Sequence, residues 1–554
     1  MHREGSDRPQ GSEVSRRGFL EGSMVAGAVG VLAAVAKAND SLAPPGSPRK
    51  ITAFALHEIS IAQLQKLMMQ GKLTSKTITQ QYLDRIREID DSGPSLNSVI
   101  EVNPDALEIS ESLDRERANK GMRGPLHGIP ILIKDNIDTL DKMATTAGSL
   151  ALIGAKPPCD AFLVQKLRQD GAVILGKTNL SEWANIRSAH STSGWSARGG
   201  LTRNPYALDR NPSGSSSGSA VAVAASLCGG AVGTETDGSI ISPSSLNGIV
   251  GIKPTLGLIS RSGIVPISHS QDTAGPMCRS VEDAAILLTA MTGVDGADAV
   301  TAESKTKLSP DYTKFLNPNG LKGAKIGVVR KYFGFLPAVD VELEKAIKAM
   351  RNAGAIIIDP VQIPSFGKFD DTELTVLLYE LKADLQAYFA RLGRSTPLRT
   401  LKDVIDFNEK HRRKEMPYFG QDLFLKAQSY GPLTSREYLK ALEHNRRMSR
   451  EQGIDAVMNK HMLDALIAPS GGPAWMTDLI DGDHYTGGSS NMAAVAGYPS
   501  ITVPAGYIYG MPIGLSFFGR AWSEPILIKL AYAFEQLTKA RRPPQFLATA
   551  DLKP

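Results

Sequence analysis

The stretch GTETDGSIISP, residues 233–243, joins an apolar run that predicts a short strand to a run of small residues that predicts a helix. The joint is filled with glycine, hydroxyl and acidic side chains, although far simpler residues could form a short connection. Backbone N–H groups at the start of a helix have no intrahelical partner and form a site for negative charge. The stretch therefore predicts a strand-to-helix turn whose backbone contacts a ligand.

A second small-residue string, NPSGSSSGSA (211–220), also stands directly before a predicted helix. Its residues 214–218 match the G-x-S-x-G nucleophile elbow of α/β-hydrolases, but that elbow needs an apolar strand immediately before it. The preceding residues are polar and interrupted by proline, which makes the elbow a weak alternative. The S-x-x-K match SPRK (47–50) is weaker still, because it lies in a linker-like segment.

A lysine ends the apolar run GIPILIKDN (128–136), which predicts a buried strand. Burial disfavours the charged form of an amine, so a partly desolvated Lys134 can act as a base near neutral pH. Such a base is what a serine nucleophile needs. The combination indicates a serine nucleophile with a lysine as its base.

Strand-like and helix-like segments alternate along much of the chain. The runs AVILG, AVGT, AKIGVV and IIID predict strands, and helical apolar spacing lies between several of them. This alternation indicates an α/β layered fold. Residues 370–460 are predicted to be mostly helical, and no Pro/Ser-rich break follows residue 50, so one large domain is expected.

Four blocks of the sequence together resemble the amidase signature family. They are GPLHGIPILIKDNIDT, AVILGKTNLSEWAN, NPSGSSSGSAVAVAAS and GTETDGSIISPSSLNGIVGIKPTLG, and their order and spacing match over residues 57–540. GTETDGSI, HSQDTAGPM and LDALIAPSGGPAW look most like the bacterial peptide amidases. The resemblance implies an α/β fold: a single large domain with a central mixed β-sheet covered by helices.

The resemblance also implies a catalytic triad. Its lysine falls on Lys134, its bridging serine on Ser215 and its nucleophile on Ser239. The bridging serine follows a cis peptide bond in the family, which places that bond between Gly214 and Ser215. The implied activity is a serine hydrolase that cleaves carboxamide C–N bonds through an acyl-enzyme, including the C-terminal amides of peptides.

Backbone N–H groups in the 233–243 stretch are implied to form the oxyanion hole, from Thr236, Asp237 and Gly238 together with Ser239. The chain departs from the usual family pattern, which has aspartate at Glu235 and glycine at Asp237. A residue with a Cβ therefore occupies a glycine position. Its carboxylate beside the site is expected to disfavour anionic substrates.

Two other functions remain as alternatives. The family includes the A subunit of the aminoacyl-tRNA amidotransferase, a glutaminase that works with partner subunits in the cytoplasm. A non-catalytic binding protein on the same fold is the second alternative. An export signal argues against the first, and an intact set of Lys134, Ser215 and Ser239 argues against the second.

The N-terminus resembles a twin-arginine export signal. SRRGFL contains Arg16 and Arg17, and a mild apolar run leads to AKA at Ala36–Ala38. We expect residues 1–38 to be the signal peptide, 39–50 a linker and 51–548 the amidase signature domain. The apolar run is too short to span a bilayer comfortably. The expected location is periplasmic or extracellular, with no stable membrane insertion after cleavage.

Composition excludes several other classes of protein. The 554 residues carry a formal net charge of +5 without a clustered basic excess, so no nucleic-acid partner is expected. The three cysteines, Cys159, Cys228 and Cys278, show no zinc-ligand spacing. Neither a metal-ligand cluster nor a nucleotide fingerprint occurs, so no metal and no cofactor are expected. The expected partner is a small-molecule or peptide amide substrate.

Several further residues have a structural role that can be predicted from the sequence. His127 is expected to be a packing or hydrogen-bonding residue, and Asp272 to support the core. Trp475 and Tyr485 flank a loop and are candidates for the pocket wall. The charged run EKHRRKE (409–415) is expected to be a solvated helical face.

Overall fold

A mixed eleven-stranded sheet runs through the computed structural model, which describes residues 53–552. The predicted signal peptide and linker lie outside the described residues. In sheet order the strands are β1 (Val99–Val102), β3 (Val173–Thr178), β2 (Pro130–Lys134), β6 (Gly230–Glu235), β8 (Thr273–Cys278), β7 (Val250–Lys253), β12 (Ser500–Ile508), β13 (Met511–Phe518), β11 (Ala465–Pro469), β9 (Lys325–Val329) and β10 (Ile356–Val361). A separate two-stranded sheet pairs β4 (Trp195–Ser196) with β5 (Gly200–Leu201).

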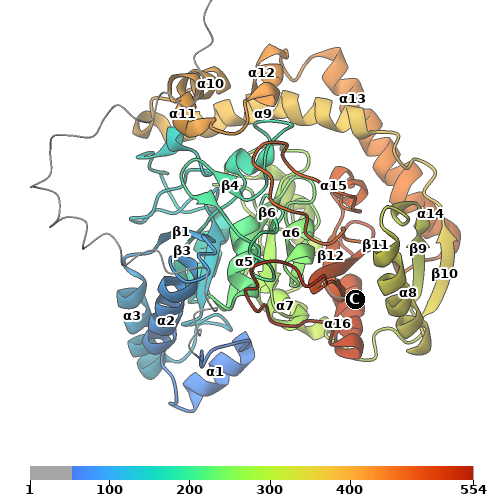
Figure 1. Ribbon diagram of the computed structural model, residues 1–554, viewed down its shortest axis with the longest axis horizontal. Coiled ribbons are helices and arrows are strands. Elements are labelled where there is room, and N and C mark those ends of the chain that lie inside the picture. The colour runs from blue at the N-terminus through green and yellow to red at the C-terminus, as the bar shows by residue number, and fades with distance from the viewer. Residues whose placement is uncertain (1–52, 553–554) are drawn as a thin grey trace, which may run out of the picture. The chain divides into compact units, whose positions relative to one another are not determined.

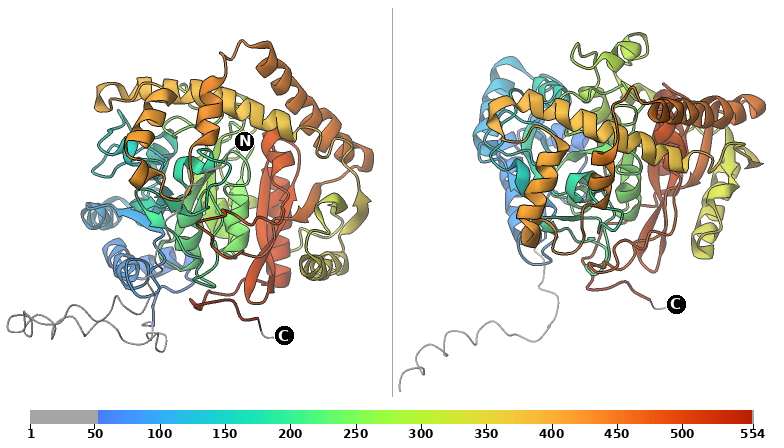
Figure 2. Two further views of the ribbon diagram at one scale, coloured as in Figure 1. Left: turned by 45° about the horizontal axis from the view of Figure 1, so that its top comes forward. Right: turned by 90° about the horizontal axis from the view of Figure 1, so that it is seen from above.

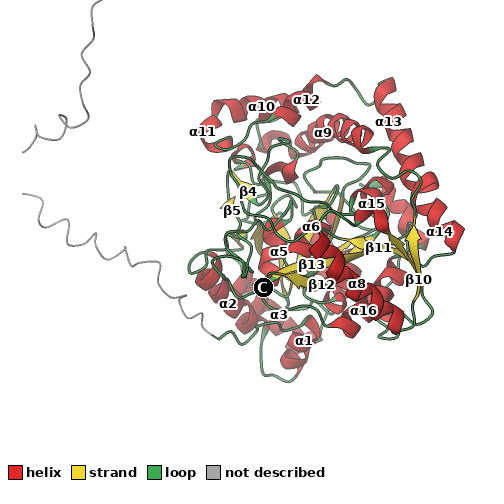
Figure 3. Ribbon diagram, turned by 45° about the vertical axis from the view of Figure 1, so that its right-hand side comes forward, coloured by secondary structure: helices red, strands yellow, loops and turns green. Residues whose placement is uncertain are grey.

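Helices surround this sheet (Figures 1 and 3). They are α1 (Ile61–Met69), α2 (Ser75–Arg85), α3 (Ala106–Lys120), α4 (Phe162–Gln169), α5 (Ser217–Ala224), α6 (Ile241–Leu246), α7 (Val281–Met291), α8 (Pro337–Asn352), α9 (Asp370–Leu392), α10 (Leu401–Lys410), α11 (Arg412–Glu415), α12 (Asp422–Ser429), α13 (Arg436–Arg446), α14 (Asp455–His461), α15 (Asn491–Ala496) and α16 (Glu524–Thr538). Among the described helices, none is long and apolar enough to cross a bilayer.

The sheet is parallel at two places and antiparallel between them. Strand β2 runs parallel to both of its neighbours, β3 and β6, and β9 runs parallel to β10 and β11. From β6 to β11 each neighbouring pair is antiparallel. The observed architecture is the predicted single α/β domain with a central mixed sheet, and residues 53–552 fall in one compact unit.

The strands that carry the site are buried on both faces. Every residue of β2, β3 and β6 is buried, as is all of α5, which packs on β6. Strands covered on both sides have near-continuous apolar sequences, which explains why PILI and VIL were readable as strands. The polar residues at their ends, such as Lys134, therefore emerge from the core rather than from solvent.

The segment predicted to be helical between residues 370 and 460 forms α9 to α14. The long helix α9 packs against α10, α12 and α13, and these helices lie together along one side of the molecule (Figures 1 and 2). The apolar side chains of α9 share a core cluster with residues such as Leu152 and Trp183. The segment is thus bound to the sheet domain by a common core.

One prediction for this segment is wrong in part. Arg412, Arg413 and Lys414 are exposed, but Glu415 is fully buried. Its carboxylate accepts a hydrogen bond from the backbone N–H of Leu150 at 2.8 Å and lies 4.0 Å from the buried Arg187 guanidinium. The buried Arg187 cation needs carboxylates near it, so Glu415 lies in the core beside Arg187 and is not part of the exposed charged face.

Candidate active site

Lys134 ends β2 and has no exposed surface. Its Nζ lies 2.8 Å from Ser215 Oγ, 2.9 Å from Thr234 Oγ1 and 3.3 Å from the Thr234 carbonyl oxygen. Burial lowers the pKa of Lys134 to about 7, although the charges of Asp272 and Glu235 act in the opposite direction. The amine is therefore neutral in much of the protein near neutral pH.

The three neighbours of Nζ define how a neutral amine is oriented. A carbonyl oxygen accepts only, so the Thr234 carbonyl takes one N–H group of Lys134. The Thr234 hydroxyl oxygen takes the second. When both N–H groups of the neutral amine go to Thr234, its lone pair is free to accept the proton of Ser215, whose Oγ lies 2.8 Å away.

Ser215 follows a cis peptide bond from Gly214, at the position that the resemblance implies. The carbonyl oxygen of Ser215 accepts a hydrogen bond from the Ser181 N–H at 3.1 Å. A Cβ on Gly214 would lie 2.1 Å from Ser181 Oγ, so a larger residue would displace that side chain. The segment after β3, which contains Ser181, therefore holds this part of the serine string.

The neighbouring Ser216 is occupied by backbone contacts. Its hydroxyl donates to the Thr234 carbonyl at 3.0 Å and accepts from the Thr234 N–H at 3.2 Å. It is completely buried, and no strand lies between residue 201 and the start of α5. The G-x-S-x-G elbow interpretation is therefore wrong, because both the required strand and a free hydroxyl are missing there.

Ser239 lies in the turn between β6 and α6, and 7% of its surface is exposed. Its carbonyl oxygen accepts from the Ser216 N–H at 3.2 Å, which joins this turn to the serine string. Glu235 closes the turn, since its Oε2 accepts from the N–H groups of Ile240 and Ile241 at 2.7 and 2.9 Å. Among the described residues, no hydrogen bond joins the Ser239 and Ser215 side chains.

The residues predicted for the oxyanion hole precede Ser239 in the same turn. Thr236 is fixed on both sides, as its hydroxyl donates to Asp272 at 2.6 Å and its carbonyl accepts from Gln271 Nε2 at 3.3 Å. Gly238 has a φ of +74°, a conformation that favours glycine. Asp237 has a buried Oδ1 without a partner in the part of the chain described, and burial raises the pKa of its carboxyl to about 7.

Asp272 supports this turn, as expected from the sequence. Besides Thr236, its carboxylate accepts from the N–H groups of Ile267 and Ser268, both at 2.8 Å. His127 is the predicted hydrogen-bonding residue. It is buried, its Nε2 lies 2.9 Å from the Leu113 carbonyl, and its Nδ1 accepts from a backbone N–H.

A cavity of about 530 Å3 opens beside the two serine-bearing segments. Ser213, Gly214, Asp237, Gly238 and Ser242 line it from these two segments. Its aromatic lining residues are Tyr332, Phe333, Phe335, Phe366, Trp475 and Tyr485. Besides Asp237, its charged lining residues are Lys331, Asp370 and Asp483. Trp475 and Tyr485 thus line the pocket as predicted, whereas the walls from 331–335 and Phe366 were missed because no motif marks them.

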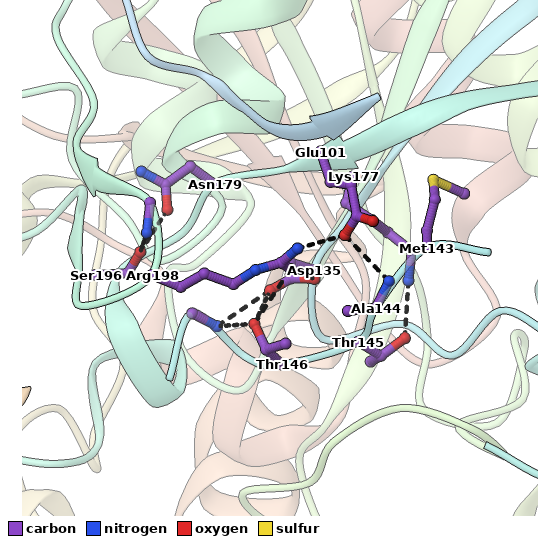
Figure 4. Close-up of polar contacts among 12 residues, drawn as sticks. Glu101, Asp135, Met143, Ala144, Thr145, Thr146, Lys177, Asn179, Ser196 and Arg198 are labelled. Carbon is purple, nitrogen blue, oxygen red and sulfur yellow. Dashed lines mark hydrogen bonds and ion pairs between the residues drawn. The ribbon is translucent and has the colours of Figure 1, made fainter. Parts of the chain in front are cut away.

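The chain that leaves β2 after Lys134 is fixed by a polar network around Asp135 and Lys177 (Figure 4). The Asp135 carboxylate accepts from Thr146, Arg198 and the Gly148 N–H. The ammonium of Lys177, at the end of β3, donates to the Thr145 hydroxyl at 2.8 Å. These contacts fix the segment that follows the strand, and none of them involves the Lys134 side chain.

One group in the described residues could in principle ligate a metal ion: His269, Glu380 and Asp384. Their donor atoms already contact one another, since His269 Nδ1 lies 3.0 Å from Asp384 and Nε2 lies 3.3 Å from Glu380. None of the three lines the 530 Å3 cavity. They are therefore separate from the Lys134 and Ser215 arrangement.

Comparison with known proteins identifies the family. The family model described as Amidase matches residues 77–528, so the chain belongs to the amidase family and is a hydrolase acting on the C–N bonds of amides. A probable amidase of Arabidopsis thaliana is 44% identical over 510 residues, covering 90% of this chain and 94% of the relative.

A solved structure and a second sequence relative support the same assignment. The native peptide amidase from Stenotrophomonas maltophilia is 53% identical, with a TM-score of 0.85, and the match covers 89% of this chain and 100% of that one. The A subunit of the glutamyl-tRNA(Gln) amidotransferase from Halorhodospira halophila is 33% identical, covering 87% of this chain and 98% of the relative. Both proteins are similar to this chain over most of its length.

Proposed function

We propose that this chain hydrolyses carboxamides with Ser239 as nucleophile, Ser215 as bridging group and Lys134 as base. The observation that carries the proposal is the buried Lys134 amine, 2.8 Å from Ser215 Oγ and with a pKa lowered to about 7. A base with that pKa is matched to neutral pH. The Ser216 to Ser239 backbone hydrogen bond keeps the nucleophile turn beside the bridging serine.

The proposed reaction begins with two proton transfers. Neutral Lys134 takes the proton of Ser215 as Ser215 takes that of Ser239, and Ser239 Oγ bonds to the amide carbonyl carbon. The N–H groups of the 236–239 turn stabilise the negative oxygen, an interaction worth about 3–4 kcal/mol per donor in comparable sites. The Ser215 and Ser239 hydroxyls are expected to come within hydrogen-bond distance in the complex with substrate, since catalytic contacts tighten on binding.

Collapse of this intermediate breaks the C–N bond. The proton held by Lys134 passes back through Ser215 to the leaving nitrogen, which departs as ammonia or an amine. Water then attacks the acyl-enzyme by the same route, with Lys134 again taking the proton. The carboxylic acid leaves, and Ser239 and Lys134 return to their starting protonation states.

We propose peptide C-terminal amides as the substrate class. The 53% identity to a peptide amidase supports this class, as does a cavity of about 530 Å3 with aromatic walls that suit an amino-acid side chain and adjoining peptide. A free glutamine fits less well. Its α-carboxylate would meet Asp237, Asp370 and Asp483, and Lys331 is the one cation among the described lining residues.

Substitution of the serines tests the relay. Ser239→Ala should abolish amide hydrolysis without loss of fold, and Lys134→Ala should be nearly as damaging at neutral pH, with partial recovery in alkali. Ser215→Ala should fall between them. Ser216→Ala is the matched control, and an inactive Ser216→Ala beside an active Ser239→Ala would overturn the assignment. A serine-directed phosphonate should label the peptide that contains TDGSI.

Ammonia release from a substrate panel tests the substrate class. The panel comprises peptide C-terminal amides, short aliphatic amides, aryl amides and free glutamine. The highest kcat/KM is expected for the peptide amides. A glutamine value above that of every peptide amide would favour the amidotransferase-like alternative.

We also propose that the chain is exported in a folded state by the twin-arginine route, with processing after Ala38. SRRGFL and AKA support this proposal. Changing Arg16 and Arg17 together to lysine should trap the precursor in the cytoplasm. Undiminished export of that variant, followed by fractionation and immunoblotting, would refute it.

A further inference from the structure

Lys253, the last residue of β7, is a buried lysine that the proposed relay does not use. Only 1% of its surface is exposed. Among the described residues its Nζ has one hydrogen-bond partner, the Pro254 carbonyl oxygen at 3.2 Å, and no ion pair within 4 Å. An ammonium group in this position is costly unless surrounding charges compensate it.

Three carboxyl groups supply the compensating charge. They are Glu235 at the end of β6, Asp237 in the nucleophile turn and Glu524 at the start of α16. Glu524 is itself held in place, since it accepts from the Thr255 N–H at 2.6 Å. Burial lowers the pKa of Lys253 to about 8 while these three charges act to raise it. Lys253 therefore changes its charge just above neutral pH.

The nucleophile turn packs directly over the strand that ends in Lys253. A Cβ on Gly251 of β7 would lie 3.0 Å from Ile240, and a Cβ on Gly275 of the neighbouring β8 would also lie 3.0 Å from Ile240. Ile240 adjoins Ser239 in sequence, and its N–H donates to Glu235. Gly251 and Lys253 lie two residues apart on β7 and therefore share a face, so the Lys253 side chain leaves the strand on the side that Ile240 covers.

The two carboxyl groups of that turn, on Glu235 and Asp237, each have a buried oxygen that no hydrogen-bond donor satisfies among the described residues. These oxygens are Glu235 Oε1 and Asp237 Oδ1. Glu235 also acts electrostatically on Lys134, but Lys134 must be neutral to serve as a base. Lys253 is then the cation that balances Glu235 during the reaction.

We propose that Lys253 is a positioning residue for amide hydrolysis: its positive charge holds Glu235, and through it the Ser239 turn, in the reactive arrangement. The inference rests on the proposed function of Ser239 and Lys134. Activity then requires an unprotonated Lys134 and a protonated Lys253 in the same molecule. The expected pH profile of kcat is bell-shaped, with its acidic limb set by Lys134 and its alkaline limb by Lys253.

The test compares pH profiles of kcat on one peptide amide. In the wild type, kcat at pH 9 should fall to about one seventh of its maximum near pH 7.5. With limbs at about 7 and about 8, about three fifths of the molecules carry the active pair of protonation states at pH 7.5 and about one tenth at pH 9. Lys253→Arg keeps the charge at every accessible pH, so its alkaline limb should disappear while kcat at pH 7.5 is largely retained. Lys253→Met should lose activity at every pH, with KM little changed.

Two further variants keep the test decisive. Glu524→Gln removes one of the charges that raise the pKa of Lys253, so the alkaline limb should move to lower pH even if Lys253→Arg does not fold. Lys177→Arg is the matched control, because Lys177 is a second buried lysine with a pKa of about 8. Its hydrogen-bond partners, the Ile137 carbonyl and the Thr145 hydroxyl, belong to the segment that follows β2 and not to the Ser239 turn (Figure 4).

The outcomes separate this inference from the proposed function. An active wild type whose alkaline limb survives in Lys253→Arg and does not move in Glu524→Gln would overturn the role of Lys253 alone. Loss of the limb in Lys177→Arg would also overturn it. A wild type that releases no ammonia from any amide, or an active Ser239→Ala, would instead contradict the proposed function.

Discussion

Replacing Lys134 by methionine is expected to abolish activity and at the same time to stabilise the folded protein at neutral pH. The fully buried amine has its pKa lowered from 10.5 to about 7, and burial is the largest cause. In the unfolded chain this lysine has its ordinary pKa. At neutral pH the unfolded state therefore binds a proton that much of the folded state does not, which lowers the free energy of unfolding.

The size of the effect depends on pH in a defined direction. Because the pKa is lower in the folded state, the wild type has its full stability above pH 10.5 and loses stability as pH falls toward about 7. Between pH 9.5 and pH 7 the loss is about 3 kcal/mol, since each pKa unit corresponds to about 1.4 kcal/mol. Methionine, of similar length and without charge, lacks this loss.

The assay is chemical denaturation of the wild type and Lys134→Met at pH 6, pH 7 and pH 9.5. The gain in unfolding free energy of the variant should be larger at pH 7 than at pH 9.5 and nearly constant below pH 7. The exposed Lys345 on α8, changed to methionine, serves as the control. A difference between Lys134→Met and wild type that does not vary with pH, or that is larger at pH 9.5, would refute a neutral buried base.

Other expectations concern the surroundings of the same amine and the cavity. Asp272→Asn should move the acidic limb of the kcat profile to lower pH, because the Asp272 charge raises the pKa of Lys134; an unmoved limb would argue against that coupling. Thr234→Val should lower kcat with little change in KM, since one acceptor that orients the amine is lost. Asp237→Asn should raise kcat/KM for amides carrying a nearby carboxylate relative to neutral amides, measured as paired ammonia-release rates. Dialysis against a chelator should leave activity intact, whereas a loss reversed by zinc would contradict the expected independence of metals.

The site residues near the strand ends can be predicted from sequence, because the features that place them there are local. The run PILIK is apolar up to its last residue, and a strand buried on both faces gives such a run. Lys134 therefore stood out as a polar group leaving the core. The small-residue strings 211–220 and 233–243 stood out for the same reason, since tight turns around a ligand exclude bulky side chains.

Other parts of the site had no local signal. Strands β8 and β13, TAGPMC and MPIGLSFF, contain proline and glycine, which hide them from pattern reading. The aromatic walls of the cavity come from residues 331–335, Phe366 and Trp475, which only tertiary packing brings together. Glu415 was misassigned because its burial depends on Arg187, more than 200 residues away in the chain.

Three lysines at strand ends show why burial alone does not select a base. Lys134, Lys177 and Lys253 are each at most 1% exposed, and burial lowers the pKa of each to between about 7 and about 8. The difference lies in their hydrogen-bond partners. Lys177 bonds a carbonyl and a threonine hydroxyl in the network behind β2, and Lys253 bonds a carbonyl alone.

Lys134 alone of these three has a serine hydroxyl within hydrogen-bond distance, and that serine adjoins the nucleophile turn. Its two other contacts, both to Thr234, can take both N–H groups of a neutral amine, which leaves the lone pair to accept a proton from the serine. A lowered pKa makes all three amines available as bases. A proton is transferred in a defined direction only where acceptors such as the two Thr234 oxygens orient the amine and a hydroxyl such as that of Ser215 can donate its proton. Partner chemistry at the end of β2, rather than depth in the core, therefore supports Lys134 as the proposed base.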